Sequence, residues 1–272
     1  MKDLKGRIAV VTGASRGLGP YIARALAREG AQVALVARSK DKLEAAAREV
    51  EALGVRAASI AADLSKDSDR KRVVERATEE LGPIDILVNN AGVEKVSRFV
   101  DLELDDVRDM IETNLVAPLA LSRLVMPGMI ERGAGHIVQV ASLAGKKGVP
   151  FNATYSATKA GLVEWTSAVR GELAGTGVQV SVVCPGFVSD AGMFVNDFEG
   201  ASAPKLAGTS SPEDVARGVI HAIVDDVAEV LVSPGPTRLM LMMNAVAPDL
   251  TRRLIERMGV VDLFRKAADR AR

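Results

Sequence analysis

Three side chains near the middle of the chain could together exchange a proton with a substrate oxygen. Tyr155 and Lys159 lie four residues apart on a predicted helix and so share one face, and Ser142 comes directly after a predicted strand. A free phenol is a poor base near neutral pH, but a neighbouring ammonium group stabilises its charged form and lowers its pKa. The serine hydroxyl would then hold a carbonyl or alcohol oxygen. This set suits the acid–base chemistry that accompanies hydride transfer, although most tyrosine–lysine pairs at this spacing are surface decoration.

A second stretch, near the N-terminus, has the features of a phosphate-binding turn. Residues 8–11 form an apolar run that suits a strand buried on both faces, and an amphipathic helix follows. Glycines in the turn between them let the backbone approach a pyrophosphate at a helix N-terminus. Their spacing is Gly-x-x-x-Gly-x-Gly rather than Gly-x-Gly-x-x-Gly, and an ordinary turn could also contain them. The predicted cofactor-binding residues here are Gly13, Ser15, Arg16, Gly17, Leu18 and Gly19.

Alternating strands and helices would position these residues. Short β-branched apolar runs predict seven strands, over residues 8–11, 32–37, 55–61, 84–88, 136–141, 178–183 and 229–232. The helix over residues 104–132 contains Pro118 and Pro127, so we expect it to be kinked or split there. The pattern predicts an α/β fold with a doubly wound, parallel, seven-stranded sheet, in which ligands bind beyond the carboxyl ends of the strands. We expect residues 1–234 to form one catalytic domain and residues 235–272 a helical tail.

The residues that follow the strands indicate which nucleotide would bind. Arg38 follows the second strand, where an acidic residue would bind a ribose 2′-hydroxyl and an arginine suits a 2′-phosphate. Arg16 could reach the same phosphate, so the pair favours NADP(H) over NAD(H), with a solvated surface arginine as the alternative. Asp63 and Leu64 follow the third strand and suit the adenine edge, although Asp63 could also cap the next helix. After the fourth strand, a turn that suits close approach to a ligand consists of Asn89, Asn90, Ala91 and Gly92.

The composition disfavours several other classes of protein. Of 272 residues, 35 are Lys or Arg and 35 are Asp or Glu, so no basic excess calls for a nucleic acid. Aromatic residues make up only 3%, which argues against base-stacking platforms and aromatic cages. The single Cys184 precludes an internal disulfide and favours a reducing compartment. His136 and His221 belong to no cluster with metal-ligand spacing, so we expect no metal.

The sequence also predicts where the protein works. The N-terminus runs straight into the first strand and leaves no room for a signal peptide. A run of about 18 apolar residues, as a transmembrane helix requires, is not found. We therefore expect a cytoplasmic protein without a transmembrane segment.

Six motifs in the right order resemble those of the short-chain dehydrogenase/reductase family, of the NADP-preferring type, over about residues 5–234. They are Thr12-Gly13-(x)3-Gly17-Leu18-Gly19, Asn89-Asn90-Ala91-Gly92, Asn114, Ser142, Tyr155-(x)3-Lys159 and Pro185-Gly186. The resemblance implies a Rossmann fold and a catalytic set of Asn114, Ser142, Tyr155 and Lys159. It also implies that the cofactor is bound by Asn90, Ala91, Gly92, Tyr155, Lys159, Pro185, Gly186 and Val188.

The resemblance further implies a role for each catalytic residue. Tyr155 would be the general acid/base, Ser142 would orient the carbonyl, and Lys159 would also bind the nicotinamide ribose. Asn114, which otherwise reads as an ordinary helix residue, would hold a water that links Lys159 to solvent. One departure concerns the position four residues after Gly186, where the family often has a threonine that contacts the carboxamide. This chain has Asp190 there, and Ser189 or a backbone shift could substitute.

The tail and one loop leave alternatives open. Apolar residues at helical spacing and interleaved arginines in residues 235–272 predict two or three amphipathic helices. These helices could cover the core or a partner subunit, form a lid over an apolar substrate, or contact a membrane surface. The loop over about residues 189–211 lies where a substrate lid belongs, and we expect it to be mobile without ligand.

These observations lead to one main hypothesis and one alternative. The main hypothesis is an NADP(H)-dependent oxidoreductase that interconverts a ketone or aldehyde and an alcohol. An apolar substrate is expected because Val149, Phe151, Met193 and Phe194 lie near the predicted pocket. The alternative is a nucleotide-binding scaffold or sensor without turnover. A homodimer or homotetramer is the expected assembly.

Overall fold

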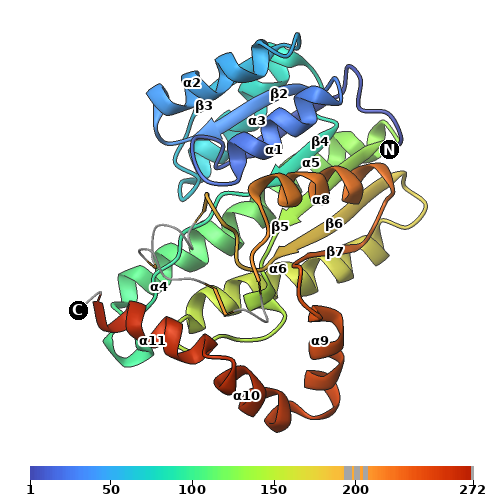
Figure 1. Cartoon of the computed structure of the whole chain (residues 1–272). Coiled ribbons are helices and arrows are strands. Elements are labelled where there is room, and N and C mark those ends of the chain that lie inside the picture. Colours follow the sequence, from blue (N-terminus) through green and yellow to red (C-terminus); the bar gives the residue numbers. More distant parts are fainter. Residues whose placement is uncertain (193–197, 199–202, 205–207, 271–272) are drawn as a thin grey trace.

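A single parallel sheet of seven strands organises the computed structural model, which describes residues 1–192, 198, 203–204 and 208–270 (Figure 1). The strand order is β3-β2-β1-β4-β5-β6-β7, so the order reverses between β1 and β4. The strands are β1 (Ile8–Thr12), β2 (Gln32–Ala37), β3 (Ala57–Ala61), β4 (Ile86–Asn89), β5 (Gly135–Val140), β6 (Val178–Pro185) and β7 (Glu229–Val232). The predicted fold class is confirmed. The third and fourth strands begin two residues later than predicted, and the sixth continues to Pro185.

Helices cover both faces of the sheet (Figure 1). One face carries α1 (Gly19–Arg28), α2 (Lys40–Glu51) and α8 (Pro212–Val224), and α1 packs against α8. The other carries α3 (Asp67–Leu81), α5 (Ala117–Glu131) and α6 (Ala153–Glu172), and α3 packs against α5. Every residue of β1, β4 and β5 is buried, which explains why these strands have no alternation of apolar and exposed polar residues, although β5 includes the buried His136 and Gln139. Each face of the sheet therefore has its own apolar core.

The long predicted helix is divided ahead of its first proline. It consists of α4 (Leu104–Ile111), a π-helical turn (Glu112–Val116) and α5, and Pro118 lies in the first turn of α5. The helix is not split at Pro127, because α5 continues through that residue to Glu131. Pro127 is exposed, so water can satisfy the carbonyl that its missing N–H leaves unpaired.

The same stretch, Leu104–Glu131, is long and apolar enough to cross a membrane by length and composition alone. It is a weak candidate, because its second half packs on the sheet. Leu121 and Met129 of α5 are fully buried in the core beneath it. The stretch therefore has the surroundings of a core helix.

The tail folds into three helices, in agreement with the predicted two or three. They are α9 (Thr237–Val246), α10 (Pro248–Arg257) and α11 (Val260–Arg270). In Figure 1 they extend in a chain from the end of β7 towards α4. An ion pair between Arg98 and Asp269 connects α11 to the loop before α4. Met193 and Phe194 and much of the predicted lid loop lie outside the described residues.

Candidate active site

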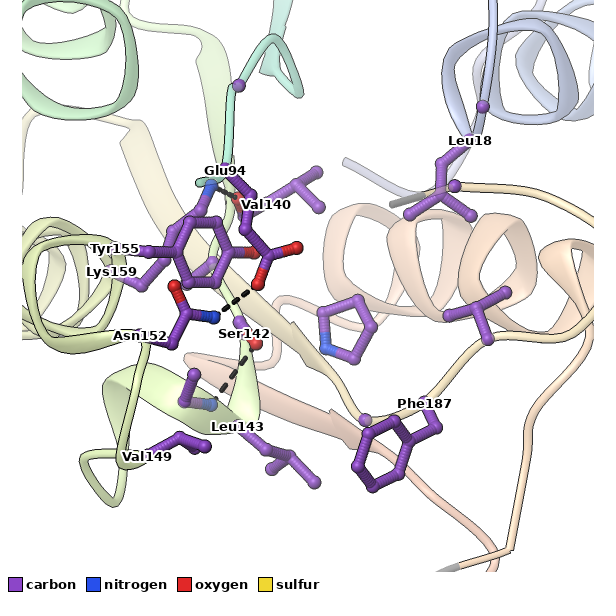
Figure 2. Close-up of a pocket in the computed structure, with 18 of the residues that line it drawn as sticks. Leu18, Glu94, Val140, Ser142, Leu143, Val149, Asn152, Tyr155, Lys159 and Phe187 are labelled. Carbon is purple, nitrogen blue, oxygen red and sulfur yellow. Dashed lines mark hydrogen bonds between the residues drawn. The ribbon is translucent and has the colours of Figure 1, made fainter. Parts of the chain in front are cut away.

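One large pocket lies at the carboxyl ends of the strands, where parallel α/β sheets bind ligands (Figure 2). Its volume of about 590 Å³ lies in the range typical of ligand sites. The predicted site residues that line it are Gly13, Ser15, Arg16, Gly17, Leu18, Arg38, Asp63, Leu64, Asn90, Ala91, Gly92, Ser142, Tyr155, Lys159, Pro185, Gly186 and Val188. Two predicted residues, Gly19 and Asn114, are buried beside the pocket without lining it.

The glycine turn after β1 has the geometry of a phosphate cradle. Gly13 and Gly17 adopt positive φ angles of 67° and 63°, which side chains other than glycine rarely allow. A side chain on Gly13 would collide with the backbone of Ala91, and one on Gly19 with the carbonyl of Gly13. The turn is tied to β4, because Asn90 Nδ2 donates to the Thr12 carbonyl at 2.9 Å. The residues present therefore fit a dinucleotide pyrophosphate at the N-terminus of α1.

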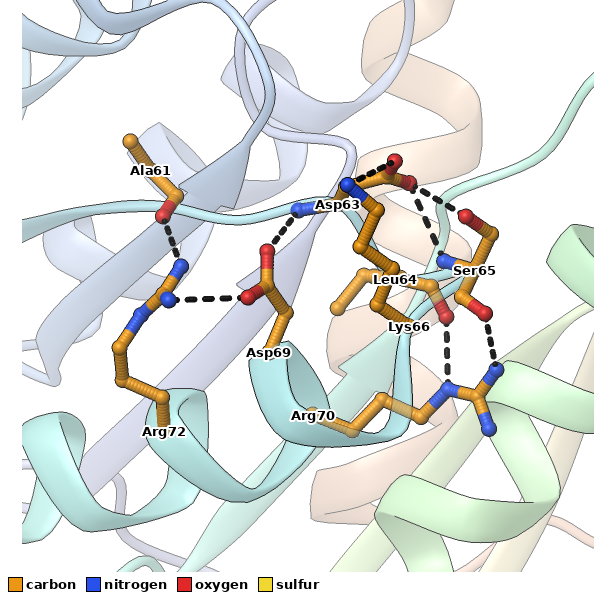
Figure 3. Close-up of polar contacts among 8 residues, drawn as sticks. All are labelled: Ala61, Asp63, Leu64, Ser65, Lys66, Asp69, Arg70 and Arg72. Atoms are coloured by element: carbon orange, nitrogen blue, oxygen red, sulfur yellow. Dashed lines mark hydrogen bonds and ion pairs between the residues drawn. The ribbon is translucent and has the colours of Figure 1, made fainter.

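Exposed arginines line the end of the pocket beyond β2. Arg16 and Arg38 are both solvent-exposed and so are free to meet a ligand phosphate. Asp63 lies beside them, and its carboxylate accepts hydrogen bonds from the hydroxyl and the backbone N–H of Ser65 (Figure 3). These bonds, together with Lys66 and Arg38, hold the pKa of Asp63 below its usual value despite partial burial. The alternative that Asp63 caps the next helix is wrong, because α3 begins at Asp67 after Lys66 and has no side-chain cap. The Ser65 bonds instead form a local turn ahead of that helix.

The structure brings the predicted Tyr155, Lys159 and Ser142 together. Lys159 is 3% exposed, and its Nζ donates to the Val140 carbonyl at 2.9 Å and lies 5.6 Å from the centre of the Tyr155 ring. Burial lowers the pKa of Lys159 to about 8. Figure 2 shows Ser142 at the end of β5, below the tyrosine hydroxyl. The Ser142 hydroxyl oxygen accepts from the Ala144 N–H at 3.1 Å, which begins a 3-10 turn (Leu143–Gly145).

Asn114 lies in the π-helical turn, where its side chain is fully buried. Its Oδ1 accepts from the Val93 N–H and its Nδ2 donates to the Val93 carbonyl, each at 2.8 Å. Nδ2 also lies 3.3 Å from the Thr158 hydroxyl, next to Lys159 in the sequence. Asn114 therefore joins the segment after β4 to α6, while its neighbour Thr113 lines the pocket.

Only part of the segment at and after the end of β6 lines the pocket. Pro185, Gly186, Phe187 and Val188 line it, as predicted. Ser189 instead directs its backbone N–H and its hydroxyl to the Ser210 carbonyl, at 3.0 and 3.4 Å. Asp190 has a positive φ of 61°, and within the described part of the chain the lining continues with Ala191 and Gly192. Ser189 is thus bonded to Ser210 and does not line the pocket, whereas the two residues after Asp190 do.

Several lining residues were not anticipated from the sequence. Glu94 and Asn152 line the pocket near Tyr155. Glu94 comes two residues after the Asn-Asn-Ala-Gly turn, in a stretch whose residue pattern does not mark it as part of a site. The tail contributes a whole wall, which consists of Gly235, Pro236, Thr237, Met240, Leu241, Asn244, Thr251, Ile255, Met258, Val260 and Phe264. Helical periodicity predicted amphipathic helices in the tail, but it did not predict that their apolar residues would line this pocket.

Cys184 and the histidines take no part in this pocket as the structure describes it. Burial raises the pKa of the Cys184 thiol to about 12, so it is not a nucleophile at neutral pH. Over the described ranges, His, Cys, Asp and Glu side chains form no group that could hold a metal ion. Near Tyr155, the polar side chains that line the pocket include Ser142, Lys159 and Glu94.

Known proteins are similar to this chain in sequence. The profile of a family described as short chain dehydrogenase matches residues 7–201. The ketoacyl reductase HetN of Nostoc sp. (strain PCC 7120) is 47% identical over 99% of this chain and 95% of its own length.

Two solved structures have a similar fold. A metagenomic short-chain oxidoreductase in complex with NADP has a TM-score of 0.72 at 37% identity, covering 84% of this chain and 97% of that one. A variant of actinorhodin polyketide ketoreductase with NADPH has a TM-score of 0.76 at 33% identity, covering 85% and 97%.

Proposed function

The chain belongs to the short-chain dehydrogenase/reductase family, and we propose that it interconverts a ketone or aldehyde and an alcohol with NADP(H) as cofactor. The observation that carries this proposal is the convergence of Tyr155, Lys159 and Ser142 at one end of a pocket whose other end has a glycine cradle and two arginines. Relatives solved with NADP or NADPH support the choice of cofactor. When bound, the cofactor supplies or accepts the hydride.

In this proposal each predicted catalytic side chain acts either on the substrate oxygen or on another catalytic side chain. The Ser142 hydroxyl holds the carbonyl oxygen, and the Tyr155 hydroxyl donates a proton to it during reduction or accepts one during oxidation. With a pKa of about 8, the Lys159 ammonium is mainly charged at pH 7 and stabilises the phenolate. Asn114 fixes the segments that carry Glu94 and Lys159, and we propose that it also holds a water between Lys159 and solvent.

The wall formed by the tail supports an apolar substrate. Its members include Met240, Leu241, Ile255 and Met258, and Val149 faces the same pocket. Flexible methionine side chains adapt to apolar shapes. We therefore favour the lid among the three interpretations of the tail, with a ketoacyl chain as one candidate because the Nostoc relative is named a ketoacyl reductase.

We also propose that the protein works in the cytoplasm as a homodimer or homotetramer. Ile111, Val116, Leu124 and Ile130 are exposed apolar residues along α4, the π-helical turn and α5. Contact with the same surface of a second subunit would remove these side chains from water. The mass in solution, measured by light scattering, tests this: a monomer at micromolar concentration contradicts it.

The Tyr155→Phe substitution tests the mechanism. It removes one hydroxyl and keeps the ring, so we expect carbonyl-dependent NADPH oxidation to fall by about 10²- to 10⁴-fold while NADPH still binds. The readout is NADPH absorbance with a panel of ketones and aldehydes, together with NADPH fluorescence for binding. Tyr21→Phe is the matched control, because Tyr21 lies outside the pocket and stacks on Arg24.

Two outcomes would contradict the proposal in different ways. Unchanged turnover in Tyr155→Phe would refute the assigned proton donor. Tight NADPH binding by the unsubstituted protein with no turnover of any carbonyl would instead support the scaffold or sensor.

A further inference from the structure

The outer side of α9 and α10 carries apolar side chains that the described part of the chain leaves exposed. Leu239, Met242 and Val246 are 65%, 68% and 87% exposed, and their spacing of three and four residues places them on one face of α9. On α10, Leu250 is 58% exposed, and Pro248 at the start of that helix is exposed as well. The bend between the two helices therefore forms an apolar surface, the tail corner, which consists of these five residues.

The tail corner lies on a different side of these helices from the wall of the pocket. Met240 and Leu241 of α9 and Ile255 of α10 line the pocket, and Thr251 of α10 is buried. Side chains one or two positions apart on a helix point in different directions, so the residues of the tail corner do not share this inner side. Figure 1 shows α9 and α10 standing away from the sheet at the edge of the molecule. An exposed apolar surface of this kind marks a site of interaction with a protein or a membrane.

Arginines without acidic partners lie beside the tail corner. Arg253 and Arg257 follow Leu250 by three and seven residues, so they share its face of α10, and both are exposed. Among the described residues, neither of them forms an ion pair. Their neighbour Arg252 points to another side of α10, where it pairs with Glu256 at 2.7 Å. The uncompensated positive charge of α10 therefore lies on its apolar outer face.

We propose that the tail corner inserts into the surface of a membrane that contains anionic lipids. The aliphatic side chains enter the boundary between headgroups and acyl chains, and the long arginine side chains reach the lipid phosphates. A lipid surface is favoured over a protein partner because residues 237–257 include no aromatic side chain, the type that commonly anchors a protein interface. This inference goes beyond the proposed function and does not depend on it.

Sedimentation of the protein with lipid vesicles, without NADPH or ketone, tests the inference. One set of vesicles consists of phosphatidylcholine, and the other also contains the anionic phosphatidylglycerol. We expect binding to the mixed vesicles to be about tenfold tighter or more and to weaken as salt is added. Val246→Glu puts a charge into the tail corner and should weaken binding to the mixed vesicles by about tenfold or more. Arg253→Gln removes one charge and should weaken it by about fivefold.

Each of the two substitutions has a matched control that should bind the mixed vesicles as the unsubstituted protein does. Val100→Glu changes a valine that is 89% exposed outside the tail, and Arg252→Gln removes an arginine that is already ion-paired. Urea unfolding compares the stability of all four variants with that of the unsubstituted protein.

Three outcomes would overturn the inference. The first is that the unsubstituted protein does not bind the mixed vesicles. The second is that each substitution weakens binding no more than its control does. The third is a lower mass of Val246→Glu by light scattering, because a second copy of the chain would then cover the tail corner. Since sedimentation requires no turnover, a failure of the proposed function would leave these results unchanged.

Discussion

At the scale of single residues, we propose that the preference for a phosphorylated cofactor depends on Arg38 more than on the glycine turn. Arg38 follows the last residue of β2 and is near enough to Asp63 to contribute to its lowered pKa. Its side chain is exposed and lines the pocket, so it can turn towards a dianion at little cost. The position was predictable because strand ends carry the ligand contacts of such sheets. Glu94 was not predictable, because its neighbours form no repeating pattern.

We expect Arg38→Ala to raise the KM for NADPH by about tenfold or more and to change that for NADH little, because a bidentate contact to the 2′-phosphate is lost. Steady-state kinetics with both cofactors and one ketone measure the change. The matched control is Lys40→Ala, because Lys40 is an exposed neighbour that pairs with Glu44. Equal increases in KM for both cofactors would show that Arg38 does not recognise the phosphate.

At the scale of elements, the apolar runs predicted the strands because both faces of this sheet are covered. The element bounds predicted from the sequence are wrong at the ends of some strands and inside the long helix. Pro185 pairs with Val232 at the last position of β6, where a proline signals a strand end. The π-helical turn around Asn114 was not predicted, because no residue type in the sequence marks such a turn. Its presence depends on the contact with Val93, which is distant in the chain.

The β5–β6 pair contains a buried histidine that should make stability depend on pH. His136 is fully buried, its Nε2 lies 2.9 Å from the Ser181 hydroxyl, and burial lowers its pKa to about 3. The unfolded chain takes up a proton near pH 6.5, whereas the folded protein does not until about pH 3. Stability from this group is therefore complete above pH 6.5 and is lost as the pH falls.

Compared with His136→Gln, we expect the unsubstituted protein to lose about 1.4 kcal/mol of unfolding free energy per pH unit between about pH 6 and pH 4. Urea unfolding of both proteins at pH 7, 6, 5 and 4 gives the difference directly. The glutamine variant serves as the control because it shares all other titrating groups. If the unfolding free energy of both proteins changed equally with pH, His136 would become charged in the folded protein as it does in the unfolded chain.

At the scale of the whole molecule, residues from both ends of the chain build one pocket. The glycine turn and Tyr155 could be predicted from local patterns, but the wall formed by the tail could not, since an amphipathic helix fits many partners. In the structure Phe264 of α11 packs edge-on to Phe198, with ring centres 4.8 Å apart, and lies 6.4 Å from Phe187. These rings join the tail to the loops that follow β6.

We expect Phe264→Ala to loosen the tail and to raise KM for long apolar ketones by about tenfold, while NADPH binds as before. The affected wall lies on the far side of the pocket from the arginines. Kinetics with ketones of increasing chain length, and limited proteolysis of residues 235–272, report the two effects. Leu239→Ala is the control, because Leu239 is 65% exposed on the same tail. Faster cleavage without a change in KM would mean that the tail covers the core and does not contact substrate.

The division of the pocket between distant parts of the chain also sets the order in which it is completed during synthesis. The glycine turn, Arg38 and Asp63 leave the ribosome about 200 residues before Phe264 does. The nucleotide end can thus form around its ligand while the opposite wall is still missing.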